Sequence, residues 1–102
     1  MSILRTLGYV KRKQPKKITV TQEHIDKGIS DCEKCPIALA MKDAGVNRPF
    51  VGVMSIRDYN NNFFHYPKKV QWFRHRFDRH LSVKPISFIL RRDDNVQQLI
   101  KI

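Results

Sequence analysis

The sequence predicts one small α+β domain with the element order β-α-β-β-α-β, in which an antiparallel sheet carries two helices on one face. Three observations favour this class. The 102 residues are 41% hydrophobic, which suffices for one modest core and excludes two domains. Two stretches repeat apolar residues at helical spacing, and short β-prone runs alternate with turn-forming clusters. We predict a domain over 18–90, with 1–17 as a basic flexible arm and 91–102 as a C-terminal tail.

The first strand is predicted at 18–20, a short run of β-branched residues. Thr21 follows as the N-cap of a helical turn, with Glu23 placed to favour the positive end of the helix dipole. Gly28 ends this turn, because glycine accepts the backbone conformations that terminate a helix. We therefore expect a strand that leads directly into a short helical segment.

A second helical stretch is marked by the residues at its two ends. Cys35 stands at a cap position, Pro36 at the first helical position and Gly45 just past the end, which is the usual asymmetry of helix termini. This stretch and the helical turn before it together form the first helix of the predicted β-α-β-β-α-β order, which is interrupted between them. Apolar residues recur at i, i+3, i+4 and i+7, so one side should face the core, at positions Ile37, Ala40, Met41 and Ala44.

Three further strands complete the predicted sheet. The run 50–56 is rich in Val and Phe and predicts a buried strand, and 63–66 predicts the next one. The polar residues 58–62 between them predict a hairpin turn, in which the aspartate and the three asparagines are turn formers and not ligands. Pro85 precedes the last strand, 86–90, whose alternating core positions are Ile86, Phe88 and Leu90.

The stretch 67–80 predicts the last helix, and its two sides differ in chemistry. The apolar side should pack on the core through Val70, Phe73, Phe77 and Leu81. The opposite side is basic and carries Lys68, Trp72, His75, Arg76 and Arg79. An indole among cations can stack on an unpaired base or anchor a protein interface. In the alternative interpretation, the arm or the final residues simply cover the indole.

The charge is strongly positive and unevenly distributed. Twenty Lys and Arg stand against nine Asp and Glu, so the formal net charge is +11 and the pI is near 10.1. Residues 1–17 hold six bases and no acid, 18–45 hold three bases and five acids, and 46–102 hold eleven bases and four acids. Both flanks therefore suit a negatively charged surface, and a polyanion is the expected partner.

We predict a non-enzymatic accessory protein that binds DNA or RNA through the basic arm and the basic side of the last helix. An alternative is a modulator or inhibitor that docks on an acidic protein or a ribonucleoprotein through the same surface. The RNP1 pattern of RNA-recognition domains is absent, so the sequence favours neither nucleic acid. The predicted contact residues are Lys11, Arg12, Lys13, Lys16, Lys17, Lys68, Trp72, His75, Arg76 and Arg79.

Cys32 and Cys35 form one C-x-x-C pair, which is half of a zinc site. Further ligands would come from His24, His65, His75 or His80, and the last two lie about 140° apart around a helix. We therefore expect no cofactor, with zinc on the two cysteines as an alternative. The favoured interpretation makes Cys35 a helix cap or a small buried residue.

Motifs typical of catalysis are absent from the sequence. It contains no G-x-S-x-G, P-loop, G-x-G-x-x-G or H-E-x-x-H pattern. The nearest acid–base grouping is His75 with Asp78 at i, i+3, which we interpret as a surface pair on a cationic helix. The sequence therefore predicts that the protein is not an enzyme.

Hydropathy argues against a membrane protein. The mean hydropathy is −0.48, and the longest wholly apolar stretch, 36–41, has about six residues where a span needs roughly 20. A short amphipathic helix at a membrane surface is a weaker alternative, resting on Ile3, Leu4, Leu7 and Val10. Two cysteines three positions apart and the lack of a signal-peptide core predict a reducing cytosol.

Several motifs occur in a characteristic order: Thr-Gln-Glu-His-Ile at 21–25, Cys-Pro-Ile-Ala-Leu-Ala at 35–40, Arg-Phe-Asp at 76–78 and Lys-Pro-Ile-Ser-Phe at 84–88. This order resembles small uncharacterised proteins of bacteriophage and prophage genomes over about 18–90. The basic arm and the strongly cationic last helix depart from that pattern. The resemblance implies a phage context, the host cytoplasm as location and, in the alternative above, a host protein as target. It implies no mechanism.

Overall fold

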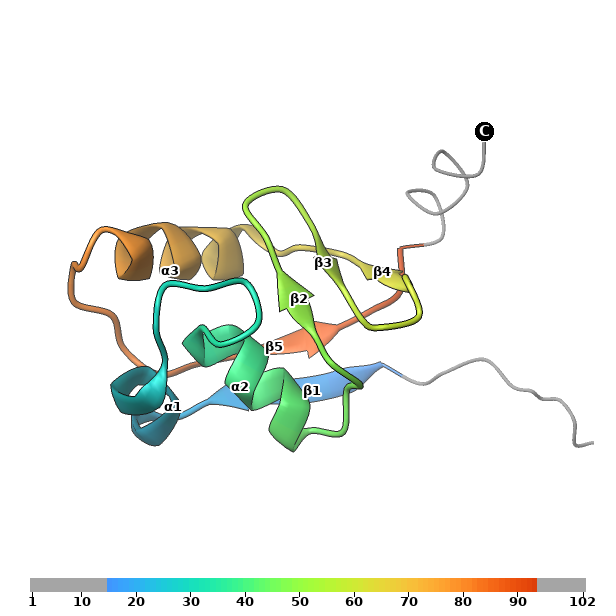
Figure 1. The fold of residues 1–102 in the computed structure, drawn as a ribbon, viewed down its shortest axis with the longest axis horizontal. Coiled ribbons are helices and arrows are strands. Elements are labelled where there is room, and N and C mark those ends of the chain that lie inside the picture. The colour runs from blue at the N-terminus through green and yellow to red at the C-terminus, as the bar shows by residue number, and fades with distance from the viewer. Residues whose placement is uncertain (1–14, 94–102) are drawn as a thin grey trace, which may run out of the picture.

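A computed structural model describes residues 15–93 and confirms an α+β domain built on antiparallel sheets (Figure 1). Every predicted helical stretch is present in this part of the chain. In chain order the elements are β1 (Lys16–Val20), α1 (Gln22–Lys27), α2 (Pro36–Asp43), β2 (Phe50–Val51), β3 (Ile56–Arg57), β4 (Phe63–Phe64), α3 (Lys68–Asp78) and β5 (Ile86–Leu90).

The strands are divided between two sheets, where the sequence predicted one. β1 pairs with β5 along its whole length, and β2, β3 and β4 form an antiparallel meander. β1 begins at Lys16, so two residues assigned to the arm, Lys16 and Lys17, belong to the sheet. The cross-strand hydrogen bonds fix their backbone, which is why this part of the basic segment is ordered.

The chain beyond β5 joins the two sheets. The backbone N–H of His65 donates to the Arg91 carbonyl at 2.8 Å, and the N–H of Asp93 donates to the Phe63 carbonyl at 2.8 Å. Phe64 and Arg92 form an antiparallel bridge between these two bonds. Residues 91–93, predicted as the start of a tail, therefore continue β5 alongside β4. Across the domain the strands then run in the order β1, β5, β4, β3, β2.

One hydrophobic cluster connects both sheets with α2 and α3. The two sides of the β1–β5 pair alternate as predicted, and α2 turns its predicted apolar side inward. α3 contributes the first half of its apolar side. The buried residues are Ile18, Val20, Phe88 and Leu90 of the strands, Ile37, Ala40 and Met41 of α2, and Val70 and Phe73 of α3.

α3 ends earlier than the sequence predicted. The helix stops at Asp78, and His80 adopts the left-handed region with φ of 62°. The N–H of Leu81 then donates to the Arg76 carbonyl at 3.0 Å, which closes the last turn. Leu81 was expected in the core but is 47% exposed. Helical periodicity no longer applies to position 81, because the chain changes direction at His80.

The predicted single strand over 50–56 is wrong, because the chain reverses inside this run. β2 and β3 are each two residues long, and the N–H of Gly52 donates to the Ser55 carbonyl at 2.8 Å. Val53 and Met54 lie at the tip of this 52–55 turn and are 76% and 88% exposed. The turn therefore exposes two apolar side chains that the sequence predicted to be buried.

The predicted turn at 58–62 is confirmed, and one carboxylate organises it. Asp58 Oδ1 accepts the backbone N–H groups of Asn60 and Asn62, each at 2.9 Å. Its Oδ2 accepts the side-chain amide of Asn62 at 3.0 Å. Asp58 is buried, and these bonds satisfy its charge within the turn.

The cap of α1 is confirmed and extends into a contact with α2. Thr21 Oγ1 accepts the His24 N–H at 3.4 Å, and the Thr21 N–H donates to His24 Nδ1 at 2.9 Å. Because Nδ1 accepts this bond, the ring proton stands on Nε2, which lies 2.7 Å from Asp43 Oδ2 at the end of α2. His24 therefore fills the N3 position of the capping box, which usually holds a Glu or Gln, opposite Thr21 at the N-cap.

Gly28 lies so close to Pro36 that a methyl group does not fit. A Cβ on Gly28 would stand 2.7 Å from the Pro36 backbone nitrogen and 2.6 Å from its Cδ. We predict that Gly28→Ala lowers the free energy of unfolding by about 1–3 kcal/mol, because α1 and α2 must move apart. Urea unfolding measures this, with the exposed Ser30→Ala as control. Equal stability of the two variants would contradict the close approach.

Candidate nucleic-acid interface

α3 presents an exposed face that carries four of the predicted contact residues. These residues recur at i, i+4, i+7 and i+11, which places them within about 60° around the helix axis. All four are exposed to solvent, and the indole is 61% exposed. We call this set the α3 stripe: Lys68, Trp72, His75 and Arg79.

Arg76 was predicted to belong to this face but lies at its edge. Its side chain is only partly exposed, and its Nε donates to the Ser82 carbonyl at 3.0 Å. That bond holds the loop after α3 against the helix. Arg76 therefore has a structural task in addition to any charge that it offers to a partner.

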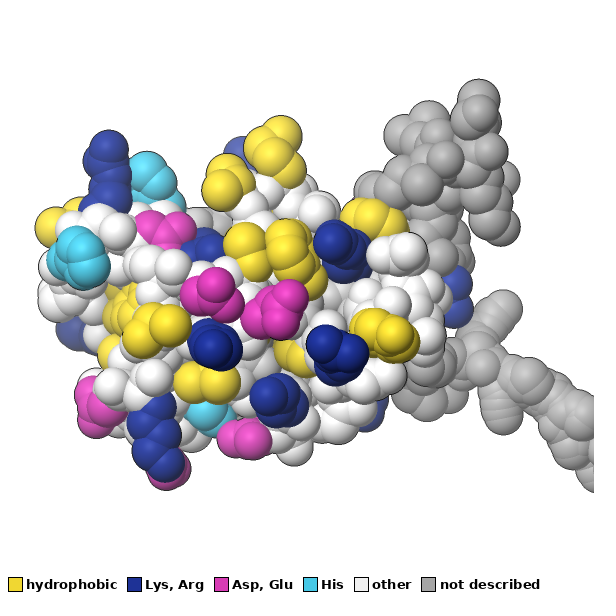
Figure 2. All heavy atoms as spheres, viewed as in Figure 1, with side chains coloured by type: hydrophobic (Ala, Val, Ile, Leu, Met, Phe, Trp, Pro, Cys, Tyr) yellow, Lys and Arg dark blue, Asp and Glu magenta, His cyan; other side chains and the backbone are white. Residues whose placement is uncertain are grey.

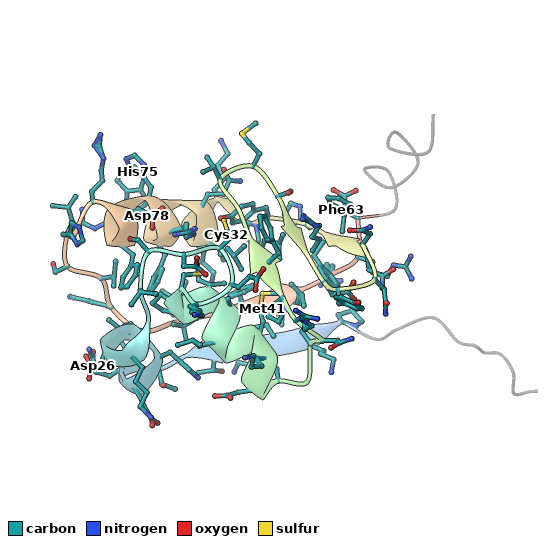
Figure 3. The ribbon with its side chains drawn as sticks, viewed as in Figure 1. Asp26, Cys32, Met41, Phe63, His75 and Asp78 are labelled. Atoms are coloured by element: carbon teal, nitrogen blue, oxygen red, sulfur yellow. The ribbon has the colours of Figure 1, made fainter. Side chains whose placement is uncertain are left out.

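Trp72 does not fold back onto the domain. Its ring stacks on the ring of His75, with centroids 5.6 Å apart and an interplanar angle of 21°. In Figure 3, His75 projects from α3 away from the rest of the domain. The stacked pair therefore forms an aromatic platform on the outer side of α3, and His75 limits the motion of the indole.

A groove of about 400 Å³ lies between the 52–55 turn and α3. Sequence reasoning missed this groove, because it depends on a turn that was predicted as a strand. Figure 2 shows hydrophobic side chains that project from the β2–β3 turn beside α3. We call it the Val53–Trp72 groove, and it is lined by Val53, Tyr66, Lys68, Gln71, Trp72, Arg74, His75 and Asp78.

Arg74 anchors α3 from beneath the groove. Its side chain is buried, and its Nε donates to the Val51 carbonyl at 3.3 Å. Its Nη1 pairs with Asp78, and its Nη2 lies 3.8 Å from Cys32 Sγ. The predicted pairing of His75 with Asp78 is therefore wrong. The carboxylate of Asp78 pairs instead with Arg74, which lies four residues earlier on the inner side of the helix, and His75 points outward (Figure 3).

Tyr66 fixes the other side of the groove. Its hydroxyl donates to the Gly52 carbonyl at 2.8 Å, which ties the 52–55 turn to the start of α3. Burial raises the pKa of Tyr66 to about 12, since the phenolate would lose its hydration. Gln71 adds a bond from its Nε2 to the Tyr66 carbonyl at 2.8 Å. Tyr66 is therefore bonded both to the turn, through its hydroxyl, and to α3, through its carbonyl.

The structure does not bring the predicted arm residues together with the α3 stripe. Lys16 and Lys17 are exposed in β1, and Lys16 Nζ donates to the Ala44 carbonyl at 3.0 Å. β1 begins at the right of Figure 1, whereas α3 ends at the left. The remaining predicted arm contacts, Lys11, Arg12 and Lys13, lie outside the described residues.

The faces of the domain differ in how far acidic side chains offset the basic ones. Figure 2 shows Lys and Arg interspersed with Asp and Glu over the face that carries α1 and α2. α3 differs, because its single carboxylate, Asp78, is paired with Arg74. The α3 stripe therefore keeps its positive charge, while acidic neighbours offset the charge elsewhere on the viewed face.

The two cysteines are free thiols with different surroundings. Cys35 is buried at the N-cap of α2, where its Sγ accepts the Ala38 N–H at 3.4 Å. Burial raises the pKa of Cys35 and keeps it a thiol. Cys32 is partly exposed. Within 15–93 no three His, Cys, Asp or Glu side chains are grouped to hold a metal ion.

No helix within the described range is both long and apolar enough to cross a bilayer. Comparison of the chain with protein-family models, with curated proteins and with solved structures finds no match.

Because of Tyr66, the free energy of unfolding should fall as the pH rises through the alkaline range. Its pKa is about 12 in the folded chain against 10 for an ordinary tyrosine, so the folded state holds this proton more tightly. The stabilisation is complete below pH 10 and is lost as the pH rises to 12. We predict that roughly 2 kcal/mol of unfolding free energy disappears over this range and that Tyr66→Phe lacks this loss.

Urea unfolding at stepped pH measures this dependence. The matched control is Tyr59→Phe, since Tyr59 is 60% exposed. That variant should keep the wild-type profile. An identical alkaline loss in wild type and Tyr66→Phe would contradict the role of the buried hydroxyl.

The two thiols should differ in reactivity. In the native protein, iodoacetamide should alkylate Cys32 at least about tenfold faster than Cys35, because Cys35 is buried and its pKa is raised. Peptide mass spectrometry after a timed reaction gives the two rates. In denaturant the rates should become similar, and equal rates in the native protein would contradict the burial of Cys35.

Proposed function

We propose that this chain is a non-enzymatic bacteriophage accessory protein that binds nucleic acid in the host cytoplasm. The α3 stripe provides the folded part of the contact surface, and the basic residues at 11–17 add charge. The observation that carries the proposal is the exposed indole of Trp72, which lies among exposed cations on a helix whose only carboxylate is already paired.

The charges of the stripe suit phosphate. Lys68 and Arg79 stand at its two ends, eleven residues apart, which on a helix corresponds to about 16 Å. Successive phosphates along one strand of a nucleic acid lie a few ångströms apart, so both cations can reach one strand at once. Phosphate contacts of this kind supply affinity without sequence preference.

A second candidate function is docking on an acidic host protein or a ribonucleoprotein. The observation that favours it is the apolar tip of the 52–55 turn, where Val53 and Met54 are 76% and 88% exposed beside the stripe. Apolar tips with a cationic rim are common at protein interfaces. The nucleic-acid proposal is preferred, because the platform next to this tip consists of aromatic rings flanked by cations.

Replacing the cations of the stripe should reduce the salt dependence of binding. We predict that the double variant Lys68→Gln/Arg79→Gln lowers the slope of log K against log salt by about 1–2, since each lost phosphate contact contributes about 0.7–0.9. Fluorescence anisotropy of a labelled oligonucleotide, measured at several salt concentrations, gives this slope.

The matched control is Lys34→Gln/Lys42→Gln, which removes the same charge from exposed positions that lie outside α3 and outside the groove lining. It should change the slope by less than half as much. Failure of the wild type to bind DNA or RNA at low salt would overturn the proposed function. If a host protein then stays bound after nuclease digestion, the second candidate replaces it.

A further inference from the structure

We propose that the Val53–Trp72 groove holds one unpaired base, so that the protein prefers single-stranded over duplex nucleic acid. This inference rests on the proposed function and adds to it the kind of nucleic acid that is bound. It is carried by the groove, by the open indole and by the hydrogen bonds that hold the two sides of the groove in place.

The indole has a free surface for stacking. His75 covers part of one ring face at a centroid distance of 5.6 Å, yet the side chain remains 61% exposed. Trp72 also lines the groove, so part of this free surface adjoins it. A base that enters the groove can stack on the indole, which is already held by His75, and continue the aromatic stack.

The groove has the size and chemistry of a small-ligand site. Its volume of about 400 Å³ falls within the range of roughly 300–1,000 Å³ typical of such sites. Val53 provides an apolar contact, while Lys68 and Gln71 provide hydrogen-bonding groups at the same groove. Gln71 gives one amide N–H to Tyr66 and retains its side-chain oxygen and second N–H for the polar edge of a base.

The groove is formed before any ligand binds. The Tyr66 hydroxyl holds the Gly52 carbonyl at 2.8 Å, and the turn closes on itself between Gly52 and Ser55. On the helix side, the buried Arg74 fixes α3 against β2 through the Val51 carbonyl. Because both sides are fixed, a bound base pays little for ordering the protein.

Duplex nucleic acid cannot use this groove. In a duplex the faces of the bases are stacked on their neighbours, and an exposed indole can reach them only after a base is unstacked. Base edges in a major groove are read mainly by Arg, Lys, Asn and Gln, and of these the stripe offers only Lys68 and Arg79, which stand at its two ends about 16 Å apart. Stacking on an unpaired base is therefore the contact that the stripe makes best.

Trp72 is the single tryptophan of the chain, so its fluorescence reports this contact directly. Three probes carry equal numbers of phosphates per strand: a single-stranded oligothymidine, the corresponding duplex and an abasic oligonucleotide. We expect the oligothymidine to quench the fluorescence and to bind about 5- to 150-fold more tightly than the abasic strand, the range that one stacked base supplies. The duplex should bind more weakly than the oligothymidine and leave the fluorescence unchanged.

Three variants at two exposed positions, Trp72 and Val53, test the groove itself without threatening the fold. Trp72→Ala should lose the preference for the oligothymidine over the abasic strand, and Trp72→Phe should restore part of it. Val53→Asp should weaken binding of the oligothymidine about fivefold, because it adds an unpaired negative charge close to the phosphates of the strand. Tyr59→Ala is the control, because it removes an aromatic side chain that is 60% exposed and not among the groove residues.

The outcomes separate the inference from the proposed function. Equal binding of the oligothymidine, the abasic strand and the duplex, with wild-type affinity of Trp72→Ala, would overturn the base groove while phosphate binding stands. Tighter binding of the duplex would overturn it as well. If none of the probes binds at low salt, the proposed function fails and the base groove fails with it.

Discussion

The arrangement of this domain depends on the contacts made by one buried guanidinium group, that of Arg74. Its side chain meets three parts of the chain at once, the Val51 carbonyl in β2, the carboxylate of Asp78 and the sulfur of Cys32 before α2. A buried cation needs such partners, since an unpaired charge in a protein interior is strongly destabilising. The position of α3 over the meander therefore follows from where the partners of Arg74 lie.

This constraint also explains why the outer face of α3 is available for binding. Arg74 and the apolar residues Val70 and Phe73 secure the inner side of the helix, so no residue of the α3 stripe is needed to hold it. The indole of Trp72 is 61% exposed and its ring contact is with His75 of the same stripe, so most of its apolar surface is not buried by the fold. The stripe is thus the part of α3 whose chemistry the fold leaves unused, which is the reason for assigning it a ligand.

Local signals predicted much of the fold, because caps and turns are decided by neighbours in sequence: Thr21 and Cys35 cap their helices as expected. The predictions are wrong where contacts between residues far apart in sequence determine the local structure. The run 50–56 turns back at 52–55, where Tyr66 holds the Gly52 carbonyl, and sequence periodicity contains no sign of that long-range bond. The candidate site divides in the same way. The stripe follows from helical spacing, whereas the groove depends on how α3 meets the turn.

The pairing of β1 with β5 has a mechanical consequence. Lys16 stands opposite Leu90, and Val20 stands opposite Ile86, so β1 begins and β5 ends at the same end of one ladder. A force that pulls residue 16 away from residue 90 acts across this ladder and breaks its hydrogen bonds one after another, whereas shear would load all of them together. The bonds of 91–93 to β4 stand between the end of the described chain and this ladder, so they must break before a pull from that side can open it.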